Sequence, residues 1–111
     1  MKTREELVTR ALQKLKVLAA GQSPSAEDAA AVDGDVLPIF ADLSRRGVYS
    51  VGDPDEIEDE AFIHLADILA NSVAADFGAT QDETVRLAAE RRLRVLGAQT
   101  LSGQVLRTNY F

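Results

Sequence analysis

The sequence predicts an all-α fold, a small bundle of about four helices followed by a partly extended C-terminal tail. Two observations lead to this prediction. Apolar residues recur three and four positions apart through most of the chain, which is typical of amphipathic helices. Capping residues precede these stretches and glycines follow them. The chain has 111 residues, 46% of them hydrophobic, enough for one domain. We expect a helical domain over residues 1–97 and a separate tail over residues 98–111.

The first helix is expected over residues 4–20. Thr3 followed by Glu6 is the pattern of a capping box, which satisfies backbone N–H groups at a helix start. Leucines at 7, 12, 15 and 18 follow at helical spacing. Gly21 suits the helix end, where a left-handed residue is often required.

The second helix is expected to begin after Ser25, a good N-cap residue, and to end at Gly47. Pro38 lies inside its apolar stripe. Proline has no N–H to donate to the carbonyl of Gly34 and crowds it, so the sequence predicts a kink or a break there. Residues 48–52 then form a short apolar loop.

The third helix is expected to open at Asp53-Pro54, because an N-cap residue followed by proline is a common helix start. Its apolar stripe includes Ile57 and continues to Phe77-Gly78. Thr80 and Glu83 repeat the capping-box pattern, and the fourth helix is expected to run from there to about Gly97.

Charge is unevenly distributed within a net charge of −6: basic ends flank an acidic middle. The acidic candidates for a lumen or inter-subunit face are Asp53, Asp55, Glu56, Glu58, Asp59 and Glu60. The basic candidates for an inter-subunit face are Arg86, Arg91, Arg92 and Arg94. These charges are either solvated helix faces or complementary surfaces that meet on neighbouring copies, since opposite charges steer association.

The tail holds four large apolar residues, Val105, Leu106, Tyr110 and Phe111. A disordered tail is normally poor in such residues. Aromatic side chains at a terminus are stabilised by burial, and the surface that buries them belongs either to this chain or to a partner.

Composition excludes several classes of protein. The chain has no cysteine, hence no disulfide and no thiolate metal site, and a single histidine cannot build a His-rich metal site. No apolar run approaches the roughly 18 residues of a membrane span, and the N-terminus lacks the apolar segment of a signal peptide. The acidic total argues against nucleic-acid binding as the main task.

Catalytic patterns are also missing, and we expect no catalytic, cofactor-binding or metal-ligating residues. His64 lies in an apolar stripe and is best explained as a structural histidine that pairs with Glu60 or Asp67. Asp42-Leu43-Ser44 has the residues of a phosphopantetheine site in the wrong order. The many carboxylates lack the aromatic cleft that a glycosidase needs.

The segments 12–29 and 62–78 resemble the head-to-tail connector (adaptor) proteins of tailed bacteriophages. In that family a first helix ends in a Leu-Ala-x-Gly-like stretch, here Leu18-Ala19-Ala20-Gly21. A proline-bearing linker and a helix that begins Ser/Thr-x-Glu/Asp-x-Ala follow, here Ser25-Ala26-Glu27-Asp28-Ala29. Residues 62–78 are similar to the family's core helix and its closing aromatic-glycine pair.

The resemblance implies a structural virion protein and no enzymatic activity. Such adaptors form a ring, often dodecameric, below the portal protein, extend the DNA channel and dock a downstream tail or stopper protein. It implies assembly in the host cytoplasm and a final place at the head-tail interface of the virion. Val105, Leu106, Tyr110 and Phe111 are then the expected portal-binding residues. DNA would only pass through the channel, and no membrane is involved. The alternative is a small intracellular helical DNA-binding or regulatory domain.

Overall fold

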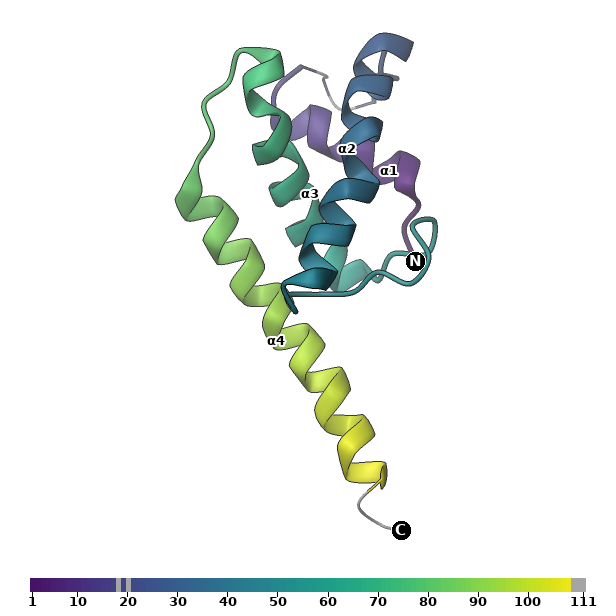
Figure 1. The fold of residues 1–111 in the computed structure, drawn as a ribbon. Coiled ribbons are helices and arrows are strands. Elements are labelled where there is room, and N and C mark those ends of the chain that lie inside the picture. The colour runs from purple at the N-terminus through teal and green to yellow at the C-terminus, as the bar shows by residue number, and fades with distance from the viewer. Residues whose placement is uncertain (18, 20, 109–111) are drawn as a thin grey trace.

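The protein is all-α, as the sequence predicts. The computed structural model describes the backbone of residues 1–17, 19 and 21–108, and the side chains of these residues up to 98. It contains helices α1 (Arg4–Lys14), α2 (Ala26–Arg45) and α3 (Asp59–Val73), a short 3-10 helix η1 (Ala74–Phe77) and helix α4 (Glu83–Thr108). Figure 1 shows α3 between α4 on one side and α1 with α2 on the other.

The core is built around α3, which packs against α1, α2 and α4. Its inward positions carry mostly leucine, isoleucine, valine and alanine, and these meet leucines from the other three helices. Among the largest fully buried side chains are six leucines: Leu7, Leu12, Leu43, Leu65, Leu69 and Leu93. Burying such side chains is the main source of stability in a domain of this size.

Helix α1 ends six residues earlier than the sequence predicts, at Lys14. The capping box at its start is confirmed, with Thr3 and Glu6 each accepting from the other's backbone N–H. The end is a Schellman motif, in which Val17 N–H donates to Leu12 O and Lys16 adopts a φ of 61°. Lysine rarely adopts this left-handed conformation, so the sequence gives no signal for this end.

Helix α2 passes through Pro38 as one continuous helix, so of the predicted kink or break the break is wrong. Gly34 and Pro38 are both exposed, and the Gly34 carbonyl that lacks its helical partner can be hydrated. The end after Arg45 is confirmed: Gly47 has a φ of 71° and Val48 N–H donates to Leu43 O. This is a second Schellman motif, with glycine in the left-handed position.

Helix α3 begins at Asp59, not at Asp53-Pro54. Ile57 is buried, as predicted, but it lies in extended backbone. Its N–H and carbonyl pair with the carbonyl and N–H of Lys2, both at 2.8 Å, in an antiparallel bridge. A residue paired in this way with the N-terminal segment cannot also be helical, so the helix starts after it.

Helix α4 begins at Glu83 and continues past Gly97 to Thr108, so the predicted end at Gly97 is wrong. The Thr80 capping box is also wrong, because Asp82 accepts from the N–H groups of Thr84 (3.0 Å) and Val85 (3.4 Å) and occupies the capping position. The described backbone of the expected tail, residues 98–108, is helical.

Candidate functional site

The six acidic candidates lie in the turn before α3 and in its first turn, and all six are exposed. Three of these carboxylates have polar partners nearby. Asp53 accepts from Asp55 N–H at 2.9 Å, Asp55 accepts from Arg4 N–H at 3.4 Å, and Asp59 lies 3.4 Å from the amino group of Met1. The carboxylates stay accessible, so this segment is a negatively charged surface.

The pKa of Tyr49 is affected by the negative charge of this segment. Its half-buried phenol has a pKa above the usual value, first because burial disfavours the phenolate and then because Glu58 and Glu60 lie close by. The turn therefore concentrates negative charge beside a partly buried aromatic side chain.

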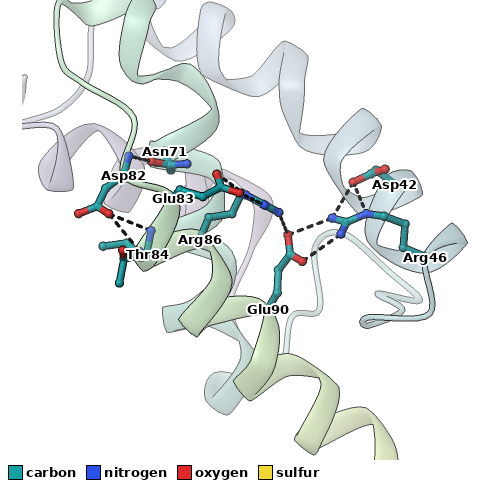
Figure 2. Close-up of polar contacts among 9 residues, drawn as sticks. Asp42, Arg46, Asn71, Asp82, Glu83, Thr84, Arg86 and Glu90 are labelled. Carbon is teal, nitrogen blue, oxygen red and sulfur yellow. Dashed lines mark hydrogen bonds and ion pairs between the residues drawn. The ribbon is translucent and has the colours of Figure 1, made fainter.

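The basic candidates fall into two groups, and Arg86 forms the first. Glu90 is buried, with only 4% of its surface exposed, and it accepts two hydrogen bonds, at 2.9 and 3.0 Å, from Arg46, the C-cap residue of α2. Arg86 donates to the same carboxylate and also to Glu83. Figure 2 shows the resulting chain of charges, with Asp42 bound to the outer side of Arg46.

This network is structural. Hydrogen bonds from Arg46 hold the pKa of Glu90 below its ordinary value despite burial, so the carboxylate stays ionised. Hydrogen bonds to Glu90 raise the pKa of Arg46, and hydrogen bonds to Glu83 raise the pKa of Arg86. Arg86 is neutralised within its own chain, which leaves little of its charge to form a basic surface. Sequence reasoning missed Glu90, because a carboxylate among four arginines of one helix looks like part of a solvated face.

Arg91, Arg92 and Arg94 form the second group and are exposed, with no ion pair to any side chain that the structure describes. Arg91 lies between two exposed apolar side chains at helical spacing. Leu87 is 50% exposed and Val95 is 42% exposed. We call Leu87, Arg91 and Val95 the outer stripe of α4. It points away from Ala89 and Leu93, which pack against the core.

An open depression of about 500 Å³ lies between α1 and α2. Its walls combine small apolar side chains with carboxylates. The lining residues are Arg4, Glu5, Val8, Ala29, Ala30, Asp33 and Asp55. Arg4 binds Asp33 through Nε–Oδ1 (2.6 Å) and Nη2–Oδ2 (3.1 Å). We call this depression the α1–α2 groove; Asp55 joins it to the acidic turn.

The residues that the sequence analysis considered as catalytic candidates lie outside the α1–α2 groove and the two charged surfaces. Asp67, a possible partner of His64, pairs with Lys14 at 2.7 Å. Ser44 lies in the last turn of α2, where its hydroxyl is 3.1 Å from that of Ser50. Within the described residues no cluster of three His, Asp or Glu side chains could hold a metal ion, and no helix is long and apolar enough to cross a membrane.

The structure does not test the candidate portal-binding residues. The side chains of Val105 and Leu106, and the whole of Tyr110 and Phe111, lie outside the described residues. Comparisons of the chain with protein-family models, with curated proteins and with solved structures find no match.

Proposed function

We propose that this protein acts by assembly, as a head-to-tail connector of a tailed bacteriophage that forms a ring below the portal and docks the next tail or stopper protein. The proposal starts from the resemblance of residues 12–29 and 62–78 to that family. It is supported by one structural observation, the presence of two unlike exposed surfaces on the same small bundle.

These surfaces are the outer stripe of α4 and the acidic turn before α3. The first combines apolar and positive side chains, and the second carries six carboxylates. A ring whose neighbours contact each other head to tail requires two different, complementary patches on every copy. Opposite charge on those patches fixes their register and excludes other pairings.

The remaining parts have roles that follow from charge and position. If the acidic turn faced the channel and not the neighbouring copy, its carboxylates would repel phosphates and let DNA slide through. The segment that holds Val105, Leu106, Tyr110 and Phe111 follows the part of α4 that packs on α3, and in this proposal it binds the portal protein. Both assignments concern surfaces and require no turnover.

The test uses the portal protein encoded in the same genome. We expect the full chain, mixed with portal rings, to add a layer of density in negative-stain images. A chain that lacks residues 105–111 should keep its helical circular dichroism spectrum and fail to add that layer. Absence of added density with the full chain contradicts the connector function. Normal binding by the truncated chain contradicts only the role of the tail.

One observation favours the alternative of duplex DNA binding: three arginines on α4 are free of ion pairs to the side chains that the structure describes. Phosphate contacts by these arginines would make binding fall steeply with salt. A salt-dependent mobility shift of duplex DNA, abolished by replacing Arg91, Arg92 and Arg94 with alanine, would support this alternative over the connector.

A further inference from the structure

We infer that the α1–α2 groove is the docking site for the outer stripe of α4 from a second copy of this chain. This inference rests on the proposed function, because it names the contact by which neighbouring copies join. It adds a specific acceptor site to the general proposal of complementary faces.

The groove has the chemistry of an acceptor for an apolar and basic helix face. Val8, Ala29 and Ala30 give it an apolar lining with little side-chain bulk. Its charges are negative in balance, since Arg4 is already paired with Asp33 and the carboxylates of Glu5 and Asp55 remain. A leucine that enters such a groove gains burial, while an arginine beside it gains a carboxylate partner.

The outer stripe offers the matching pattern. Leu87, Arg91 and Val95 are four residues apart, so they lie along one face at steps of about 6 Å. The two apolar side chains flank the guanidinium, and all three are exposed on a helix whose opposite face is anchored on α3. Among the described side chains Arg91 has no ion-pair partner, and covering this face would bury two apolar side chains and could give the guanidinium a carboxylate partner.

A second copy must supply one of the two surfaces. Helix α4 lies on one side of α3, whereas α1 and α2 lie on the other (Figure 1). The stripe therefore cannot reach the groove of its own chain without unpacking the bundle. A contact between two different patches is heterologous, so each copy keeps one free stripe and one free groove, and the contact extends into a ring or a filament.

Cysteine cross-linking tests this contact directly, because the natural chain has no cysteine. We expect A30C, in the groove, and L87C, in the stripe, to form a mixed disulfide when the two variants are combined and mildly oxidised. Both positions are exposed, so neither substitution disturbs the core. Trapping a disulfide also detects an association that is weak in solution.

The matched control is A31C, which replaces the neighbouring exposed alanine outside the groove lining. A30C should give about tenfold more mixed disulfide with L87C than A31C does. Equal yields from the two alanine positions, or no disulfide from A30C, would overturn the inference.

Charge variants check the role of Arg91. In the L87C chain, R91E should lower the yield about tenfold because a carboxylate then faces Glu5 and Asp55, and D55R in the A30C chain should restore it. R92E is the matched control, since Arg92 is exposed but lies off the stripe, and it should leave the yield unchanged. A yield that is insensitive to R91E would also overturn the inference.

The two proposals fail in different ways. If the full chain adds a layer to portal rings but A30C and L87C do not cross-link there, the connector function stands and the groove is not the contact. If the cross-link forms but portal rings gain no density, the contact stands and the connector function fails.

Discussion

Helices α3 and α4 are adjacent and antiparallel, yet they serve the molecule differently. Helix α3 contacts α1, α2 and α4, and seven of its 15 residues are buried. Helix α4 is longer, but its contacts with other helices are to α3, and its described side chains from Thr84 to Ala98 are mostly exposed. Stability is therefore concentrated in α3, and the surface of α4 is available for partners.

Truncating one leucine in each helix tests this comparison and should give the largest effect. Leu69 of α3 is 1% exposed and sits among core side chains. We expect L69A to lower the free energy of unfolding by about 2–5 kcal/mol, because it leaves a cavity. L87A, in the outer stripe of α4, should change it by less than about 0.5 kcal/mol. Urea unfolding followed by circular dichroism measures both. A similar loss for the two variants would show that α4's outer face is not free.

Glu90 is a buried residue on the mostly exposed helix α4. Replacing it is expected to cause the second largest loss of stability. E90Q removes the buried charge that Arg46 and Arg86 share, and leaves them only their exposed partners Asp42 and Glu83. We expect a loss of about 1–3 kcal/mol in the free energy of unfolding. E83Q is the matched control, since Glu83 pairs with the same Arg86 at the exposed surface, and it should have little effect. Equal unfolding curves for E90Q and the natural chain would contradict a structural role for the network.

The cost of E90Q should also depend on pH. The pKa of Glu90 is lower in the folded chain than its ordinary value of 4.5, so its charged form stabilises the fold at pH values above 4.5. This stabilisation is lost as the pH falls through the lowered pKa. The difference between the natural chain and E90Q should therefore be full at pH 7 and shrink in acid. A difference that stays constant down to pH 3 would assign the cost of E90Q to packing.

The smallest effect concerns the start of α4. D82A removes the side chain that accepts from Thr84 and Val85 N–H and should cost about 1 kcal/mol. T80A, at the capping position that the sequence predicts, should leave the free energy of unfolding nearly unchanged. The reverse ranking would restore the Thr80 capping box and contradict the observed helix start.

Some helix boundaries can be predicted from the local sequence, and others cannot. Thr3, Ser25 and Gly47 act on neighbours within five residues, and the structure confirms all three. The ends at Lys14 and Asp59 were predicted wrongly. One depends on a lysine in a left-handed conformation, and the other on a bridge between Ile57 and Lys2, which lie 55 positions apart. No short-range pattern carries either signal.

The candidate surfaces divide in the same way. Charge clustering found the acidic turn and the exposed arginines of α4 from the sequence alone. It did not single out Arg86, which pairs with Glu83 and Glu90 of its own helix. It could not find Arg46, which meets Glu90 at 44 residues' separation. The α1–α2 groove was likewise invisible, since its walls come from two helices and the turn before a third.

The order of apolar and capping residues by itself determined that this chain forms helices with one buried face each, because those preferences act over a turn or two of backbone. The tertiary structure alone decided which charges meet a partner from a distant part of the chain. An ion pair requires two side chains within about 4 Å, and here the packing of α4 and α2 around α3 brings Arg46 to Glu90 while leaving Arg91 in solvent.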